Sequence, residues 1–165
     1  MSRVAPVTGA AGERARRVLD GVMDPEIPVV SVTDLGIIRF IEAQGERLRV
    51  GVAPTYLGCP ATRVIQQTVA AALQEAGFAQ VEVVTVLDPP WSSADLSERG
   101  RARLEAFGIA PPTQARSHDP FGTPRRCPHC HSDDTECVSE FGSTPCKALY
   151  RCRSCLEPFD YFKCL

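Results

Sequence analysis

The chain has 165 residues, a net charge of −2 and 44% hydrophobic residues. This composition is typical of a globular protein with room for a domain of roughly 100 residues and a small second module. With 18 Lys/Arg against 20 Asp/Glu, it lacks the basic excess of a nucleic-acid-binding protein. No apolar run approaches the roughly 18 residues of a membrane span, and the N-terminus lacks the apolar core of a signal peptide. We therefore expect a cytoplasmic protein with neither nucleic-acid nor membrane partners.

The cysteines divide the chain. Cys59 stands alone, and the other seven of the eight lie between Cys127 and Cys164. In a reducing compartment this usage favours metal binding or thiol chemistry over disulfides. We expect an α/β domain over residues 12–110, a proline-rich linker over 111–126 and a cysteine module over 127–165.

The first domain is predicted to be a small mixed sheet with helices, in the order α-β-β-α-β-α. The small and polar residues 1–11 indicate a disordered tail. Hydrophobic periodicity and turn residues then predict the elements in chain order: a helix over 12–23, a hairpin of strands 36–43 and 48–52, a helix over 61–76, a strand over 81–87 and a helix over 95–107. The first strand is expected to be more central than the second because apolar residues occupy both of its faces.

A loop with two prolines precedes the hairpin. The segment Asp24-Pro25-Glu26-Ile27-Pro28 cannot form a regular helix, and Asp34-Leu35-Gly36 closes the loop. The carboxylates of Asp24, Glu26 and Asp34 either shape turns and cap helices or serve a site. The structural alternative is favoured for Asp34.

Cys59 lies in the stretch Thr55-Tyr56-Leu57-Gly58-Cys59-Pro60-Ala61, between a strand and a helix. Gly58 allows a tight turn, and Pro60 suits the first position of a helix. The helix N-terminus would lower the pKa of the Cys59 thiol and favour the thiolate, which is a nucleophile and a metal ligand. The alternative is a small buried side chain beside a turn.

The cysteine module contains two C-x2-C pairs, Cys127/Cys130 and Cys152/Cys155, separated by 21 residues. Two such turns supply four sulfurs in the tetrahedron that Zn²⁺ prefers, and the separation is close to that of a zinc ribbon. An Fe–S cluster on the same four cysteines is the second interpretation. A module of this size is expected to need its metal to fold.

Several residues of the module are left over. Cys137, Cys146 and Cys164 have no assigned role, and His129 and His131 are spare ligand candidates or exposed turn residues. The tail holds Phe159, Tyr161 and Phe162. Because three aromatics are many for so small a core, we expect a protein-contact patch there.

Two sets of motifs resemble known families. Asp24-Pro25-Glu26-Ile27-Pro28, Asp34-Leu35-Gly36 and Thr55-x-x-Gly58-Cys59-Pro60-Ala61 resemble the domain family of SufT and the eukaryotic cytosolic iron–sulfur targeting factor. The segment 139–152 and the Phe159–Lys163 ending resemble the accessory-subunit family of phenylacetyl-CoA epoxidases, PaaD or PaaJ, of aerobic phenylacetate degradation.

The resemblance implies a non-catalytic subunit that assists iron–sulfur or iron centre assembly in a partner, either the epoxidase reductase or its oxygenase component. It assigns the site to Cys59, Thr55, Asp24 and Glu26, with iron or a cluster held transiently at Cys59. A single cysteine cannot hold a cluster stably, so a partner or a homodimer would supply further ligands. The alternatives are a structural adaptor subunit and an enzyme with its own thiol chemistry, the latter disfavoured because no histidine of the α/β domain can serve as a base.

Overall fold

The structure is a computed structural model that describes residue 7, residues 9–112 and residues 125–163. The chain forms two compact units, residues 1–100 and 101–165. Cys164, His118 and most of the predicted linker lie outside the described residues. No helix among the described residues is both long enough and apolar enough to cross a membrane.

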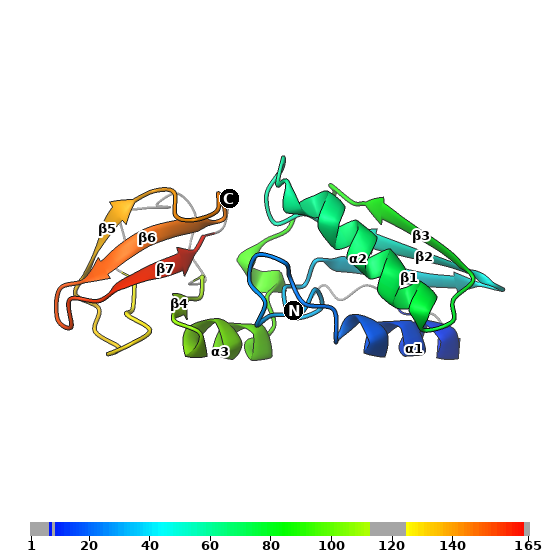
Figure 1. Cartoon of the computed structure of the whole chain (residues 1–165), viewed down its shortest axis with the longest axis horizontal. Coiled ribbons are helices and arrows are strands. Elements are labelled where there is room, and N and C mark those ends of the chain that lie inside the picture. Colours follow the sequence, from blue (N-terminus) through cyan, green and yellow to red (C-terminus); the bar gives the residue numbers. More distant parts are fainter. Residues whose placement is uncertain (1–6, 8, 113–124, 164–165) are drawn as a thin grey trace. The chain divides into compact units, whose positions relative to one another are not determined.

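The N-terminal unit has the predicted element order, with one short 3-10 helix added before the last helix (Figure 1). Its elements in chain order are α1 (Gly9–Leu19), β1 (Ile38–Gln44), β2 (Arg47–Val52), α2 (Ala61–Glu75), β3 (Gln80–Thr85), η1 (Ser93–Asp95) and α3 (Glu98–Ala106). The last helix, α3, continues into the C-terminal unit, because the boundary follows Gly100.

A three-stranded sheet in the order β1-β2-β3 supports this unit. The hairpin of β1 and β2 is antiparallel, and β2 runs parallel to β3. The central strand is therefore β2, which corrects the expectation that the first strand is more central. Both strands carry buried aliphatic side chains, and the second neighbour of β2 arrives only after the α2 crossover, so the local pattern of the hairpin does not reveal it. Figure 1 shows α2 lying across the sheet.

The predicted disordered tail over residues 1–11 is wrong at its end, because α1 begins at Gly9 and Val7 forms a parallel bridge with Ile41. Its residues 1–6 and 8 lie outside the described residues. The helix ends at Leu19, four residues before the predicted end. Backbone N–H groups of Gly21 and Val22 bond to carbonyls only three residues back, which tightens the last turn.

The loop between α1 and β1 is fixed by a buried carboxylate. The Oδ1 atom of Asp34 accepts bonds from Arg99 Nε at 2.6 Å and Ser97 Oγ at 3.1 Å, and its Oδ2 accepts from Ser31 N at 3.3 Å. These bonds outweigh the effect of burial and hold the pKa of Asp34 below its ordinary value. The structural interpretation of Asp34 is therefore supported.

The segment after β3 packs against this loop. Trp91 Nε1 donates to Leu35 O at 2.7 Å, and Asp95 forms a buried ion pair with Arg39 at 3.1 Å. The predicted helix over 95–107 begins later, as α3 at Glu98, because Asp95 ends the short η1, which a capping box with Ser92 begins, and Leu96 after it is extended. Gly36 has φ +69°, and a Cβ there would meet Asp95 O at 2.0 Å, so only glycine fits.

The C-terminal unit is built on a four-stranded sheet in the order β4-β7-β6-β5. Its strands are β4 (Ile109–Ala110), β5 (Thr135–Ser139), β6 (Lys147–Cys152) and β7 (Pro158–Phe162). The two residues of β4 stand at the end of the predicted α/β domain, but they pair in parallel with β7 of the C-terminal unit.

The aromatic tail forms the core of this unit, which corrects the expected contact patch. Phe159, Tyr161 and Phe162 are all less than 5% exposed. The Tyr150 ring packs against Phe159 and Tyr161 at centroid distances of 5.9 and 5.7 Å. The additional strand β4 widens the sheet, so the small unit covers more aromatic surface than the cysteine-flanked segment alone suggests.

Candidate functional site

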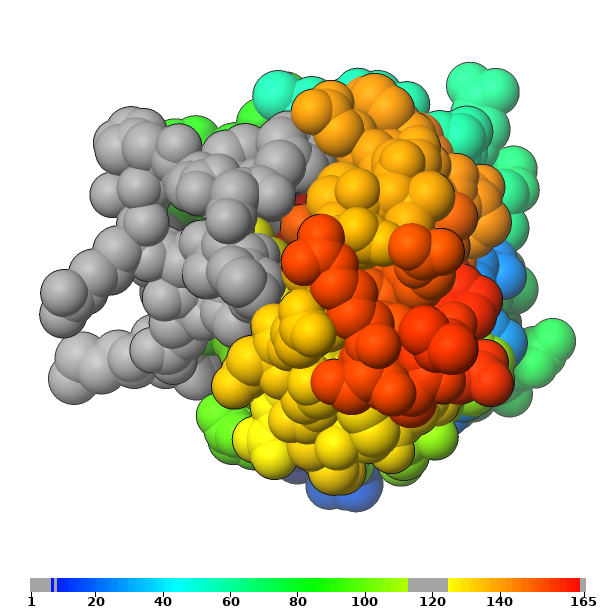
Figure 2. All heavy atoms as spheres, turned by 90° about the vertical axis from the view of Figure 1, so that its left-hand side faces the viewer, coloured from blue at the N-terminus to red at the C-terminus, as the bar shows by residue number. Residues whose placement is uncertain are grey.

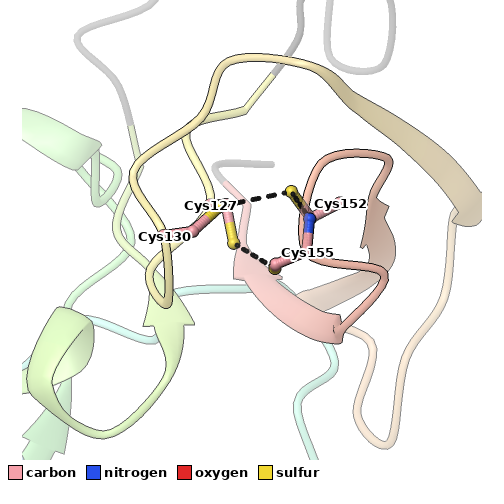
Figure 3. Close-up of side chains that lie close together, drawn as sticks. All are labelled: Cys127, Cys130, Cys152 and Cys155. Atoms are coloured by element: carbon pink, nitrogen blue, oxygen red, sulfur yellow. Dashed lines mark hydrogen bonds between the residues drawn. The ribbon is translucent and has the colours of Figure 1, made fainter.

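The two C-x2-C turns bring their four sulfurs together. Figure 2 shows the segments around residues 125–135 in yellow and 150–158 in orange-red side by side at the surface of this unit. All four Sγ atoms lie within 4.8 Å of one another. Across the turns, Cys127 Sγ lies 3.8 Å from Cys155 Sγ, and Cys130 Sγ lies 3.5 Å from Cys152 Sγ (Figure 3).

These distances fit one metal ion. A tetrahedron with metal–sulfur bonds of about 2.3 Å has edges of about 3.8 Å. In a [4Fe–4S] cluster the four thiolates bind four irons, and in a [2Fe–2S] cluster they bind two irons in pairs, so thiolates on different irons lie farther apart than those on one ion. The donor set therefore matches a single tetrahedral ion in both its chemistry and its dimensions.

The two turns share one backbone feature and differ in their hydrogen bonds. The residue after the second cysteine of each pair is left-handed, with φ 62° at His131 and 66° at Leu156. His131 N donates to Cys127 O at 2.9 Å, and Cys155 N donates to Cys152 Sγ at 3.5 Å. The Cys155 N–H is the main cause that lowers the pKa of Cys152 to about 6. One thiolate is thus stabilised before any ion binds.

One contact between the turns escaped the sequence analysis. Ser132 Oγ and Ser154 Oγ lie 2.7 Å apart and join the two turns. Each serine lies within two residues of one of the four cysteines. That proximity is the sequence feature that could have indicated the contact. The structure thereby links the two turns by a side-chain contact in addition to the four cysteines.

The surplus residues of the module lie outside the four-sulfur group. His131 Nδ1 faces Glu105 Oε1 at 3.4 Å, and Cys146 is buried with its Sγ 3.1 Å from Thr144 Oγ1. Cys137 is exposed on β5. Among the described residues, the only grouping of three or more His, Cys, Asp or Glu side chains that could hold a metal is the set of four cysteines.

Cys59 lies where the sequence places it, between β2 and α2. Gly58 has φ +89° and makes the turn, and Pro60 is the N-cap residue instead of the predicted first residue of the helix, which begins at Ala61. Cys59 N donates to Tyr56 O, and Cys59 O accepts from Thr62 N, both at 3.2 Å. The side chain is half-buried.

The expected low pKa of Cys59 is not found. Burial is the largest effect and raises the pKa of the thiol, and the negative charges of Glu26 and Asp24 raise it further. Hydrogen bonds from the backbone N–H groups of Ala61 and Thr62 act in the opposite direction without overcoming them. The N–H groups at the helix N-terminus lower the pKa of Cys59 as predicted, but burial and the two carboxylates together raise it by more. The thiol is therefore protonated at neutral pH.

The carboxylates beside Cys59 have distinct environments. Asp24 is 8% exposed, and its Oδ1 accepts bonds from Glu26 N and Ile27 N, both at 2.8 Å. Asp24 therefore shapes the loop in addition to placing a charge near Cys59. Glu26 is half-buried, as is Thr55. The structure thus brings Asp24 and Glu26 close enough to Cys59 to act on its charge, without gathering the three into a preformed metal site.

Comparisons with known proteins match both parts of the chain. A family described as "Iron-sulfur cluster assembly protein" matches residues 13–87, and one described as "PaaD zinc beta ribbon domain" matches residues 111–163. A crystal structure of a domain of unknown function, DUF59, from Bacillus anthracis is similar with a TM-score of 0.54 and 26% identity. That similarity covers 58% of this chain and 92% of the other.

A relative matches along the whole length. This protein of Escherichia coli (strain K12), which is named as a putative 1,2-phenylacetyl-CoA epoxidase subunit, is 44% identical over 165 residues, or 100% of both chains. The two family matches fall on the two structural units that carry Cys59 and the four clustered cysteines. The chain therefore belongs to the PaaD family of phenylacetyl-CoA epoxidase subunits and joins an iron–sulfur-assembly-type domain to a PaaD zinc β-ribbon.

Proposed function

We propose that this protein is a cytoplasmic accessory factor that assists assembly of an iron or iron–sulfur centre in another component of a phenylacetyl-CoA epoxidase. The client is the reductase or the oxygenase component. In this proposal the protein turns over no substrate of its own, and Cys59 is the residue that handles the metal. The observation that carries the proposal is the position of Cys59, half-buried at a strand–helix turn beside two carboxylates.

The chemistry around Cys59 supports transfer rather than catalysis. All three histidines of the chain lie between residues 118 and 131, so no imidazole of the α/β domain is available to activate the thiol. A thiol held protonated by burial and by nearby carboxylates ionises more readily when a cation arrives, because the cation offsets both the burial and the negative charge. One cysteine provides a single thiolate, so the remaining ligands come from the client or from a second copy of the chain.

In the same proposal the four clustered cysteines hold Zn²⁺. Zinc favours four thiolates in a tetrahedron and undergoes no redox change. Its role here is structural: it joins the two turns and completes a unit with a small core. The ion would fold the C-terminal unit and take no part in the transfer.

Metal analysis and client activation test this proposal together. The wild type, Cys59→Ser and Cys127→Ser are purified anaerobically and mixed with iron-free reductase and oxygenase components. We expect Cys59→Ser to keep its zinc, to lose any bound iron and to fail to activate the client. Full activation by Cys59→Ser would contradict the proposal and leave a structural adaptor as the better description.

A further inference from the structure

One edge of the N-terminal sheet gathers the segments around Cys59. Strands β2 and β3 are parallel, so their carboxyl ends lie at the same edge, where Val86 N donates to Val52 O at 2.8 Å. The loop before β1 reaches this edge as well, because Ala53 N donates to Ile37 O at 2.7 Å. Three segments therefore meet here: the loop before β1, the turn that carries Cys59, and the chain that leaves β3.

Exposed apolar side chains are confined to these segments and the adjoining first turns of α2. Among the described residues of the N-terminal unit, four large hydrophobic side chains are exposed: Met23 at 39%, Leu57 at 69%, Val64 at 47% and Leu87 at 58%. Leu57 and Val64 flank Cys59 in sequence, Met23 precedes Asp24, and Leu87 follows β3. We call these four residues the apolar rim. Isolated exposed hydrophobics scatter over ordinary surfaces, whereas all four of these belong to segments that meet at the edge carrying Cys59 or to the first turn of α2 beside it.

The same segments have a one-sided charge. Residues 18–38, 50–62 and 83–98 contain no Lys or Arg. They contain seven carboxylates, namely Asp20, Asp24, Glu26, Asp34, Asp88, Asp95 and Glu98. Two nearby basic residues pair with these carboxylates: Arg39 with Asp95, and Arg99 with Asp34 and Asp20. The first turn of α2 adds one exposed basic residue, Arg63, against the carboxylates of the edge. The edge as a whole is acidic as well as apolar.

We propose that the apolar rim is the docking surface for the client, and that it receives a client segment in which apolar side chains are accompanied by Lys or Arg. This inference rests on the proposed function, because it places the client's metal-binding cysteines against Cys59. Apolar contacts would supply the affinity, and the acidic edge would select and orient a basic partner. A basic segment would also offset the negative charge of Glu26 and Asp24, which adds to burial in keeping Cys59 protonated.

The test measures binding separately from activation. The purified reductase and oxygenase components, each without metal, are titrated with the full-length protein at low and high salt. The variants are Leu57→Ser/Leu87→Ser, which removes two rim side chains, and Glu26→Lys, which reverses a charge. Glu75→Lys, an exposed position near the other end of α2, and Phe107→Ser, an exposed apolar position of the other unit, are the matched controls.

We expect the double variant and Glu26→Lys each to weaken binding to one component at least tenfold, with the controls within twofold of the wild type. Binding should weaken as salt increases. Wild-type binding to neither component, or unchanged affinity in both rim variants, would overturn the docking surface. Self-association lost in the rim variants, with client binding intact, would assign the rim to a second copy instead and also overturn it.

Cys59→Ser separates this inference from the proposed function. It is expected to bind the client with wild-type affinity and yet fail to activate it. If Cys59→Ser fails to activate while the rim variants bind normally, the docking surface is wrong and the transfer role stands. If Cys59→Ser activates fully while the rim variants lose binding, the transfer role of Cys59 is wrong and the docking surface stands.

Discussion

The two cysteine sites of this chain are built on opposite principles. In the C-terminal unit four sulfurs lie within 4.8 Å of one another, and a backbone N–H already stabilises one thiolate. In the N-terminal unit a single thiol lies beside two carboxylates, and its pKa is raised. The four-cysteine arrangement suits an ion that stays bound. The single thiol of Cys59 suits a metal ligand that must release its ion.

The surroundings of the two sites differ in the same sense. The four-cysteine site belongs to a small unit whose core consists largely of Tyr150, Phe159 and Tyr161 together with two of the ligands themselves, Cys127 and Cys152. The loops around Cys59 are instead anchored by packing and by Asp34, Gly36 and Trp91, without any cysteine. We therefore expect loss of metal to unfold one unit and to leave the other intact.

The largest effect should come from removing a buried member of the four-cysteine group, the proposed zinc site. Cys127 is 0% exposed, and Cys127→Ser leaves three thiolates. Because structural zinc supplies on the order of 10 kcal/mol of apparent binding free energy, the C-terminal unit should lose its fold. Hydrogen exchange, read separately on the peptides of each unit, should show loss of protection after residue 100 only.

The matched control is Cys137→Ser, which changes an exposed cysteine outside the four-sulfur group. It should keep one zinc per chain and wild-type protection. Treatment of the wild type with a chelator should reproduce the Cys127→Ser pattern. Loss of hydrogen-exchange protection to the same extent in both units would contradict the view that metal stabilises the C-terminal unit and packing stabilises the N-terminal unit.

A second prediction concerns the packing that supports the Cys59 side. Gly36→Ala places a Cβ 2.0 Å from Asp95 O in a left-handed conformation, so the chain must shift. We expect the N-terminal unit to lose about 3 kcal/mol or more. Gly45→Ala is the control, with a similar φ of +60° and nothing within 4 Å, and should cost only about 1 kcal/mol. Urea unfolding followed by the single, buried Trp91 measures both, and equal losses would show that the close contact has no effect.

Asp34→Asn should have a smaller and pH-dependent effect. Removing the charge-assisted bonds to Arg99 and Ser31 is expected to cost about 2 kcal/mol at neutral pH. The folded pKa of Asp34 is below its ordinary value of 3.8, so the stabilisation is fully present above that value and is lost as pH falls through the folded pKa. The difference between wild type and variant in urea unfolding should therefore be constant above about pH 5 and shrink below pH 4. A difference that does not shrink in acid would contradict the ionic role.

Local patterns predicted most of the fold. The hairpin turn at residues 44–46, the glycine after α2 and the two C-x2-C turns depend on residues close in sequence, and all occur where expected. The central position of β2 and the pairing of β4 with β7 depend on strands that arrive much later in the chain, which the local pattern does not contain.

The candidate sites show the same limit. Spacing alone identified the four clustered cysteines, because their geometry is set within each turn. The pKa of Cys59 was predicted in the wrong direction, because the sequence reveals the helix N-terminus but not the burial or the approach of Glu26. The aromatic tail was misjudged for a related reason: its cover includes β4, some 50 residues earlier in the chain.

The smallest predicted effect tests whether the charge of Glu26 helps to raise the pKa of Cys59, in contrast to the stabilised thiolate of the four-cysteine site. Glu26→Gln removes one of the two charges that raise the pKa of Cys59 and leaves the carboxylate's shape nearly unchanged. Alkylation of Cys59 by iodoacetamide, read on its own peptide by mass spectrometry, reports the fraction of thiolate at each pH. Its inflection should lie above the ordinary value of 9.0 in the wild type and move to lower pH in Glu26→Gln.

Glu75→Gln, near the distant end of α2, should leave that inflection unchanged, which excludes a general effect of net charge. The direction is decisive because the two interpretations of Glu26 predict different results. If its carboxylate only shaped the loop, the neutral amide would leave the titration of Cys59 as in the wild type. If it acts through charge, the variant exposes more thiolate at rest, and Cys59 should then bind iron more readily without a client and release it less readily. An unchanged inflection would mean that burial alone keeps the thiol protonated, and the contrast between a permanent and a transient site would lose its electrostatic basis.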